Sequence, residues 1–500
     1  MVNRFHPLRS FIDQAWNSRS HLLFLLSLFA IICYLYTISK GFFFLGDTNN
    51  YLEYSGHNSL VGTFFWHDRL WTPGMALVLT ALRWFVTPVV SLQLYLVVCI
   101  VVSWFTLAAL FSYLGMSRSM SLTSASMVML AGVQHWLWKS ALSEPLLMST
   151  LLTTILLQWR FFESKKVGWL ILSTFFAIML SLSRYQGALL AVILWSGIII
   201  QQLFSPKDSK QNGKSRGLLL TALVQSAILS LIPVSWYVLI YKTQTGYWLP
   251  VRDPSTVGTN LASLMTSLLS ISPYDASLTV LGWLTLGLIG FNTSWKKSMM
   301  SLLWLVALAV MGFSAFSLYS AMRYNAVPYI PGRYLSPVFP VIGIMIFLIG
   351  SLVASKTRLA ASAAHYITPV TILLAAVTLS ISSLHTLSLA RTVNNPLTDR
   401  FVGFSPVIQA QCPDTVIRHT LSRNWVVNSF EWLCPNIQVL NEQYNEKILS
   451  DQVALSAYKL ELPGEESQTL WGKPLHWYQV GADAAVVPLG EIFSHRALFE

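Results

Sequence analysis

Residues 92–114 read LQLYLVVCIVVSWFTLAALFSYL, a run of 23 residues without a charged side chain. The hydrocarbon core of a bilayer is about 30 Å thick, and a helix needs about 20 apolar residues to cross it, so this run predicts a transmembrane helix. Similar runs recur through the first 389 residues. Eleven spans are expected, at residues 21–39, 92–114, 120–138, 142–159, 167–182, 187–204, 218–241, 277–292, 299–319, 335–354 and 366–388. They predict an all-α polytopic membrane domain.

The composition supports this class and divides the chain into two domains. Apolar residues make up 54% of the 500 residues and charged residues only 11%, against about 25% charged in soluble proteins. This balance excludes a disordered chain and argues against a soluble enzyme. Residues 1–389 carry nine acidic and 24 basic residues, whereas residues 390–500 carry twelve acidic and eight basic ones. The bases lie between apolar runs and form no patch, so we expect no nucleic acid partner.

The basic residues also predict the orientation of the spans. With the N-terminus in the cytoplasm, 15 bases of the membrane domain fall on the cytoplasmic side and nine on the outer side, which agrees with the positive-inside rule. The first segment lacks a small-residue cleavage site, so we expect an uncleaved anchor. The apolar segment at residues 74–85 is too short to cross and is interrupted by Arg83. We expect it to lie at the outer interface, within an outer loop at residues 40–91, with Arg83 reaching toward water; a short true span stays an alternative.

The tail at residues 390–500 is predicted to be a small α/β domain outside the cytoplasm. Residues 414–423 suggest a helix, and residues 437–440 and 484–488 suggest strands. Cys412 and Cys434 lie in this tail, where the compartment permits a disulfide; two free thiols are the alternative. Cys33 and Cys99 fall within apolar spans and are expected to be packing residues. The sequence shows no zinc-type Cys/His spacing and no glycine-rich phosphate loop.

Charges gather on the predicted outer side, although bases should be scarce there. Ionisable groups at a membrane boundary are retained mostly where they act on a substrate or an ion, so one outward polar site is expected. Asp47 follows Gly46 and could be a helix N-cap or a general base. His67, Asp68 and Arg69 could form a solvated turn or the rim of an anionic-ligand site. The acids concerned are Asp47, Glu53, Asp68, Glu144, Asp253 and Asp275, and the bases are Arg69, Lys139, Arg184, Arg252, Arg323 and Arg333.

Four motifs follow one another on this outer side. They are Gly46-Asp47-Thr48 with Tyr51-Leu52, Arg69 with Pro73-Gly74, Leu142-Ser143-Glu144-Pro145-Leu146, and Pro331-Gly332-Arg333-Tyr334-Leu335-Ser336-Pro337. Their order and shared side make the chain similar to bacterial glycosyltransferases of the GT-C fold, above all the branch of protein O-mannosyltransferases and the lipid A aminoarabinose transferase. The resemblance covers the whole layout of residues 1–389. Many members have an acidic pair where this chain has Asp47-Thr48, so the resemblance assigns no metal ligand and leaves the need for a divalent cation open.

The resemblance implies a reaction and roles for particular residues. Such enzymes move a sugar from a polyprenyl-phosphate donor to an acceptor hydroxyl outside the membrane, which requires a carboxylate base and cations for the leaving phosphate. Asp47 is the expected base of an inverting displacement, and Arg333 the first candidate for the phosphate, because a guanidinium binds phosphate oxygens bidentately. The expected substrate-binding residues are Arg333, Tyr334, Arg69, His67, Asp68, Glu144, Arg184, Tyr185, Lys139 and Tyr51.

Structural roles compete with several of these assignments. Arg184 and Lys139 could simply anchor helix ends at the interface, Glu144 could be a first-turn helix acid, and Arg333 could pair with an acid of the outer loop. A flippase or transporter of lipid-linked glycans, or a polymerase or ligase of such glycans, is the alternative function. The acceptor, whether glycan, lipid or protein, is not readable from the chain. The resemblance favours an integral protein of a bacterial inner membrane, in contact with membrane lipid.

Overall fold

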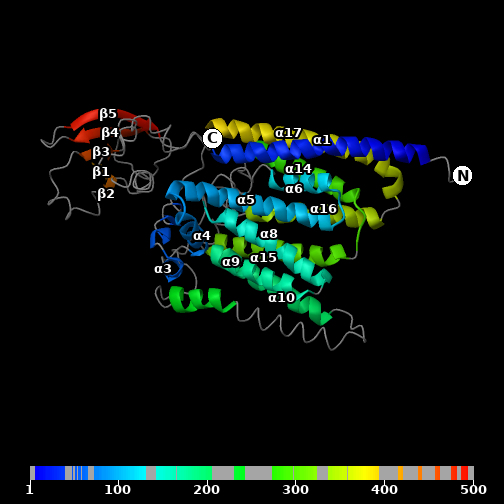
Figure 1. Ribbon diagram of the computed structural model, residues 1–500, viewed down its shortest axis with the longest axis horizontal. Coiled ribbons are helices and arrows are strands. Elements are labelled where there is room, and N and C mark those ends of the chain that lie inside the picture. Colours follow the sequence, from blue (N-terminus) through cyan, green and yellow to red (C-terminus); the bar gives the residue numbers. More distant parts are fainter. Residues whose placement is uncertain are drawn as a thin grey trace.

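The fold is described from a computed structural model of the 500-residue chain. It covers residues 6–39, 48, 51–52, 54–57, 59–65, 72–130, 142–164, 166–204, 230–242, 273–296, 298–323, 336–356 and 359–392, together with five strands between residues 415 and 493. Figure 1 shows long helices side by side in a bundle, with α1 beside α17 along one edge. The mostly helical architecture expected for the first 389 residues is thus observed.

Ten long helices build the described part of the bundle. They are α1 (His6–Ser39), α5 (Pro88–Tyr113), α6 (Arg118–Met129), α8 (Glu144–Ser164), α9 (Val167–Ser183), α10 (Tyr185–Phe204), α14 (Pro273–Phe291), α15 (Ser298–Arg323), α16 (Phe339–Lys356) and α17 (Leu359–Thr392). Shorter elements are η1 (Ser55–His57), α3 (Leu60–Phe65), α4 (Gly74–Arg83), η2 (Trp236–Lys242) and η3 (Ser336–Val338).

Five stretches among the described residues are long and apolar enough to cross a membrane: His21–Ser39, Val90–Tyr113, Ser298–Ala315, Phe339–Lys356 and Ile367–Ser388. Shorter apolar helices accompany them, including Val167–Ser183 and Ser277–Phe291. The protein is therefore an integral membrane protein, while the total of eleven spans stays a prediction. Helix α4 has ten residues and is about 15 Å long at 1.5 Å per residue, so it does not span the bilayer, as expected.

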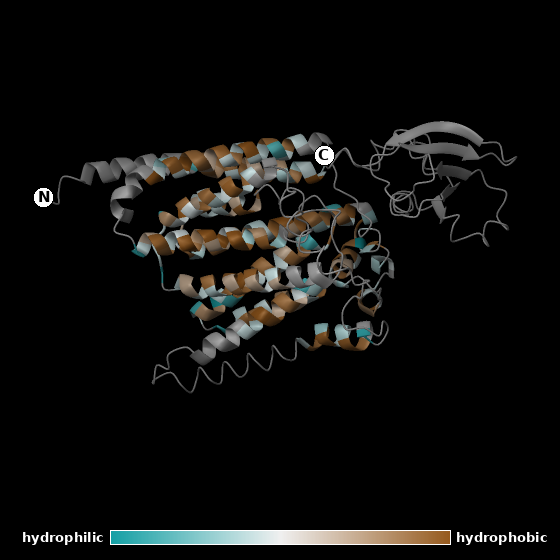
Figure 2. Ribbon diagram, turned by 180° about the vertical axis from the view of Figure 1, so that it is seen from behind, coloured by the Kyte–Doolittle hydropathy of each residue, from teal (hydrophilic) through white to brown (hydrophobic). Residues whose placement is uncertain are grey.

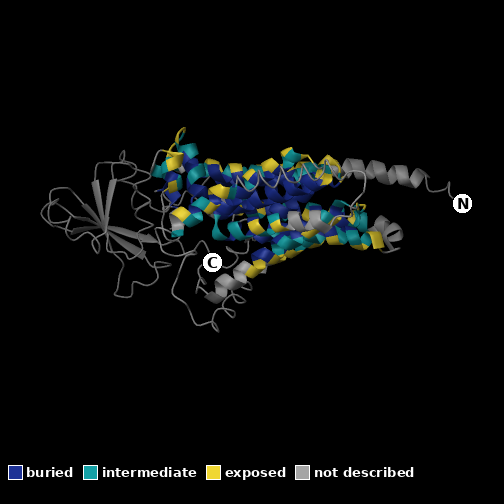
Figure 3. Cartoon of the chain, turned by 90° about the horizontal axis from the view of Figure 1, so that it is seen from below, coloured by how far each residue is buried: buried dark blue, intermediate teal, exposed yellow. Residues whose placement is uncertain are grey.

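The outside of the bundle is apolar and the inside is closely packed. Phe105 is 72% exposed and Leu284 60% exposed, and Figure 2 shows hydrophobic residues along most of the length of the helices. Exposed apolar side chains at such density suit contact with lipid. The buried residues lie along the middle of the bundle (Figure 3).

Glycines allow two of the helices to approach each other closely. A Cβ on Gly290 of α14 would collide with the carbonyl oxygen of Phe347 on α16, and one on Gly350 of α16 would collide with that of Gly287 on α14. Small residues at a helix contact are a common means of packing within membranes, where apolar surface is already satisfied by lipid. The pair α14 and α16 thus forms one of the tight seams of the bundle.

The tail contains a five-stranded mixed sheet. Its strands are β1 (Thr415–His419), β2 (Ile437–Asn441), β3 (Ala457–Glu461), β4 (Pro474–Val480) and β5 (Val486–Phe493), in the order β2-β1-β3-β4-β5. Strand β1 pairs in parallel with β2 and β3, whereas β3–β4 and β4–β5 are antiparallel. Strand β2 covers the segment predicted at residues 437–440, and β5 overlaps the one predicted at 484–488.

The helix predicted at residues 414–423 is wrong, because β1 occupies Thr415–His419. Thr415, Val416 and Ile417 are three consecutive β-branched residues, whose χ1 restriction favours strands over helices. Among the described residues of the tail there are strands alone, so the helical part of the predicted α/β domain stays a prediction. Cys412 and Cys434 also lie outside them, so their pairing stays a prediction.

Candidate functional site

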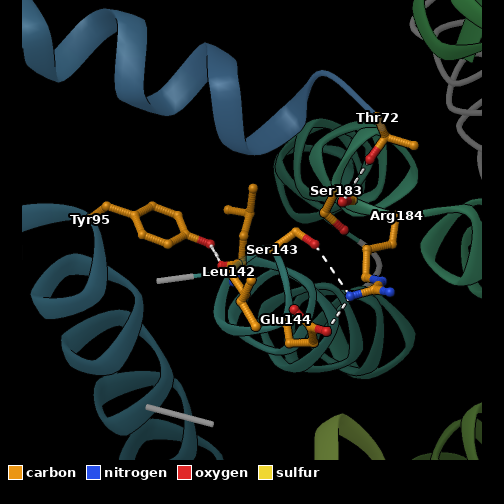
Figure 4. Close-up of polar contacts among 8 residues, drawn as sticks. Thr72, Tyr95, Leu142, Ser143, Glu144, Ser183 and Arg184 are labelled. Atoms are coloured by element: carbon orange, nitrogen blue, oxygen red, sulfur yellow. Dashed lines mark hydrogen bonds and ion pairs between the residues drawn. The ribbon is translucent and has the colours of Figure 1, made fainter. Parts of the chain in front are cut away.

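The candidate site lies at the end of the bundle where α9 ends and where α5, α8 and α10 begin. We call this end of the bundle the site end. Four described candidates come from this end: Glu144 and Arg184 at helix termini, Tyr185 at the start of α10, and Tyr51 in the first loop. Figure 4 shows how the first two lie together with Ser143, Tyr95 and Thr72. The geometry depends on how two helix ends are held.

Helix α8 begins at Glu144, directly after Ser143, and Pro145 follows in its first turn. Proline is tolerated there because the first helical N–H groups have no partner within the helix. The Tyr95 hydroxyl, from α5, lies against this start: it donates to the Leu142 carbonyl at 2.6 Å and accepts from the Leu146 N–H at 3.3 Å. One buried tyrosine therefore ties the beginning of α8 to α5.

Glu144 and Arg184 form a buried ion pair. The Arg184 guanidinium contacts the Glu144 carboxylate, and its Nη1 also donates to the Ser143 hydroxyl at 3.4 Å. The Glu144 side chain is 1% exposed and the Arg184 side chain 16% exposed. Glu144 lies in the first turn of α8, as the alternative of a first-turn helix acid expected. It also forms the ion pair with Arg184. Arg184 lies largely inside the protein, so a simple interfacial anchor does not describe it.

The backbone of Arg184 is fixed by its neighbours. Arg184 has an extended conformation, with φ −162° and ψ 160°, and separates α9 from α10. The Thr72 hydroxyl donates to the Ser183 carbonyl at 2.8 Å, and a Cβ on Gly74 would lie 2.6 Å from the Leu182 carbonyl oxygen. The turn that precedes α4 therefore packs against the last turn of α9 and fixes the position of the Arg184 backbone.

A second contact reaches the same turn of α9. The Tyr237 hydroxyl donates to the Ser181 carbonyl at 3.0 Å, and its ring centroid lies 5.8 Å from that of Tyr185. Tyr185, which directly follows Arg184 in the chain, therefore packs against the ring of Tyr237. Its contact with a substrate stays a prediction.

Residues of the first loop pack beneath α4. Tyr51 is 2% exposed and belongs to the hydrophobic core, so any contact of its side chain with a substrate also stays a prediction. The Arg83 Nη1 donates to the Leu52 carbonyl at 2.9 Å and to the Ser55 hydroxyl at 2.8 Å. The expectation that Arg83 reaches toward water is therefore wrong: it fastens α4 to the first loop, and partial burial lowers its pKa.

The other predicted residues lie outside the described part of the chain. They are Asp47, His67, Asp68, Arg69, Lys139, Arg333 and Tyr334. Within the described residues, no group of three His, Cys, Asp or Glu side chains could hold a metal ion.

Sequence reasoning missed two residues that organise the site. Tyr95 looks like one more member of an apolar span, and a single hydroxyl among apolar residues is only a weak signal. Thr72 directly precedes the Pro73-Gly74 motif, but nothing local indicates that its partner is Ser183, 111 residues away. Both contacts depend on helices that meet only in the folded chain.

Comparison with known proteins adds the fold. No protein-family model matches the chain, and no curated protein matches its sequence. The crystal structure of ArnT from Cupriavidus metallidurans in the apo state is similar to it with a TM-score of 0.51 and 13% identity, over 90% of this chain and 94% of that one. The structure of the same protein bound to undecaprenyl phosphate matches with a TM-score of 0.50 and 12% identity, over 88% and 92% of the two chains. This membrane protein therefore has the fold of ArnT, which confirms the fold resemblance inferred from its motifs.

Proposed function

We propose that the protein is a membrane glycosyltransferase that moves a sugar from a polyprenyl-phosphate donor to an acceptor hydroxyl at the site end. The observation that carries this proposal is the buried Glu144–Arg184 pair at one membrane boundary, in a fold whose solved example is bound to undecaprenyl phosphate. A fixed cation at that depth suits a lipid-linked phosphate, because it meets the charge that develops as the phosphate leaves.

The proposed reaction is a single displacement that inverts the anomeric centre. The acceptor oxygen forms a bond to the anomeric carbon while the bond from that carbon to the phosphate oxygen breaks. Asp47 takes the proton of the acceptor hydroxyl, and polyprenyl phosphate leaves with the bonding electron pair. Asp47 follows the first span in sequence, a position consistent with a base at the membrane surface.

We assign the donor phosphate to Arg333 and Arg184. A guanidinium binds phosphate oxygens in a planar, bidentate geometry, and Arg184 keeps 16% of its side chain exposed. Glu144 is then a positioning residue that fixes the direction of this guanidinium. Further substrate contacts are proposed for Tyr185 and Tyr51 and for five residues outside the described part: His67, Asp68, Arg69, Lys139 and Tyr334.

The proposed location follows from the basic loops. The N-terminus is placed in the cytoplasm and the tail outside, so the site end faces the outer leaflet of a bacterial inner membrane. The acceptor belongs to the class of glycan, lipid or protein hydroxyls.

The placement of charge favours transfer over transport. In the described parts of α5 to α17, Lys and Arg lie near helix ends, such as Arg118, Lys242 and Lys356. A translocation path for a phosphate would be expected to carry cations deep within the bundle. Charges restricted to the boundaries support a site that works at one membrane surface.

The test is transfer by the purified full chain in liposomes, supplied with a panel of polyprenyl-phosphate sugars and hydroxyl acceptors. The wild type is expected to release polyprenyl phosphate with formation of a glycosylated product, and Asp47→Asn to lose at least about 100-fold in rate, the usual contribution of a general base. Asp208→Asn, in a loop predicted on the other side of the membrane, is the matched control and should keep full activity. Transfer at the wild-type rate by a folded Asp47→Asn variant would overturn the assignment, and sugar-lipid flipping without transfer would favour the transporter.

A further inference from the structure

A cavity lies at the end of the bundle opposite the site end, where α5 and α14 end and α6 and α15 begin. It has a volume of about 390 Å³, which is within the usual range of ligand sites, about 300–1,000 Å³. Its walls come from the α5–α6 turn, the α14–α15 turn and α17, so three segments that are far apart in sequence build it together. None of these segments contributes to the site end.

The mouth of this cavity is polar and positively charged. Lys296, Ser294 and Ser117 line it and are exposed, and no acidic residue is among its lining residues. Within the described chain, Lys296 forms no ion pair with a carboxylate, and Arg118 begins the neighbouring helix α6. The charge of the Lys296 ammonium therefore suits an anionic ligand.

The local backbone makes room for that ammonium. Gly115 has a φ of +95°, a left-handed conformation that favours glycine. A Cβ at this position would collide with the Lys296 Nζ. Lys296 thus reaches from the α14–α15 turn across to the α5–α6 turn, over the cavity, and a side chain at residue 115 would displace it.

The floor of the cavity is apolar, with a polar wall. Leu114, Met120 and Ile289 line the floor and are at most 6% exposed. On the wall, the Asn292 amide donates to the Thr371 hydroxyl at 3.3 Å. A cationic mouth above an apolar floor matches an amphiphile with an anionic head better than it matches a fully hydrated ion.

The cavity also lies at the depth of a lipid head group. Val90–Tyr113 of α5 comprises 24 residues, which extend about 36 Å at 1.5 Å per residue, slightly more than the hydrocarbon core of about 30 Å. Residues 114–117, directly after this span, therefore lie at the membrane–water boundary opposite the site end.

We propose that this cavity binds the phosphate head group of an anionic membrane lipid, with Lys296 as the phosphate ligand and the apolar floor receiving the adjoining glycerol and first acyl carbons. The binding site is separate from the proposed donor site and does not depend on glycosyl transfer. It assigns the protein a structural or regulatory lipid in the leaflet away from the site end.

The test uses the purified full chain in detergent and measures equilibrium binding by native mass spectrometry. The probes are dioleoyl phosphatidic acid, dioleoyl phosphatidylcholine, glycerol 3-phosphate and inorganic phosphate. Phosphatidic acid is expected to bind, and phosphatidylcholine is expected to bind far more weakly. The Lys296→Gln substitution should lower the affinity for phosphatidic acid by about five-fold, the usual effect of one base near an anionic lipid surface. Lys296→Arg should restore binding, which separates loss of charge from misfolding.

Two controls keep the proposal open to refutation. Lys166→Gln removes another exposed lysine at the same end of the bundle, at the start of α9, and should leave binding unchanged. Met120→Trp fills the floor and should weaken lipid binding while Lys296 is intact. If the Lys166 and Lys296 variants lost the same affinity for phosphatidic acid, the effect would be a general electrostatic attraction, and the proposed site would be refuted. Binding of inorganic phosphate or glycerol 3-phosphate as tightly as phosphatidic acid would overturn the lipid assignment.

Discussion

Removing the charge of Glu144 is expected to leave Arg184 buried without its counter-charge. Breaking a buried ion pair by removing one partner typically costs about 3–5 kcal/mol of unfolding free energy. Glu144 is 1% exposed, so water cannot replace the lost interaction, whereas Arg184 is 16% exposed and can recover part of its hydration. We therefore expect Glu144→Gln to cost about 3 kcal/mol, at the lower end of this range.

A double-mutant cycle isolates the pair. Arg184→Met removes the cation and keeps an apolar side chain, and the double variant Glu144→Gln, Arg184→Met contains no unpaired charge. Because a buried pair can often be exchanged for neutral residues at little cost, the double variant should be more stable than Glu144→Gln alone. The expected coupling energy is about 2–3 kcal/mol.

The measurement is unfolding of the purified full chain by sodium dodecyl sulfate in mixed micelles, followed by tryptophan fluorescence. The matched control is Glu163→Gln, which removes an exposed carboxylate from the last turn of the same helix and should change the free energy of unfolding by less than about 0.5 kcal/mol. Additivity of the Glu144 and Arg184 variants within about 0.5 kcal/mol would refute the reasoning, because it would mean that the pair contributes nothing beyond its separate members.

Two further substitutions test how the site end is assembled, in the same unfolding assay. Gly74→Ala places a Cβ against the backbone of α9 and should lower the free energy of unfolding by about 1–3 kcal/mol through overpacking. The control Gly168→Ala meets open space and should leave the free energy of unfolding unchanged or raise it by up to about 1 kcal/mol. Equal effects of the two substitutions would contradict the contact between Gly74 and α9. Tyr95→Phe leaves the start of α8 without its hydroxyl partner and should cost about 1–3 kcal/mol, while Tyr113→Phe, at the other end of α5 and 44% exposed, should change stability by less than about 0.5 kcal/mol.

Several features of the fold follow from local sequence. The apolar run at residues 92–114 becomes α5 (Pro88–Tyr113), because a backbone in lipid must satisfy its own hydrogen bonds and a helix does so within one segment. The short length of the segment at residues 74–85 likewise predicted a helix that does not cross. The strand at Thr415–His419 could have been predicted from its β-branched residues, although residues 414–423 were predicted to form a helix.

The candidate site was only partly predictable. Glu144 and Arg184 were both placed on one side of the membrane by counting spans, yet the sequence shows no sign that they pair across 40 positions. Their partners Thr72 and Tyr95 carry ordinary side chains whose roles depend on distant carbonyl groups. Such contacts leave no local pattern, because a single hydroxyl can bond to any backbone group that the fold presents.

The sequence by itself determined that this is a membrane protein and along which stretches of the chain its long apolar helices lie. These properties are sums over neighbouring residues, since burial in lipid depends on the local density of apolar side chains and charges. The tertiary structure alone decided that Glu144 holds Arg184, that Arg83 fastens α4 to the first loop, and that Lys296 lies over Gly115 above a cavity. Those contacts join residues from separate helices, and only the packing of the bundle brings their atoms together.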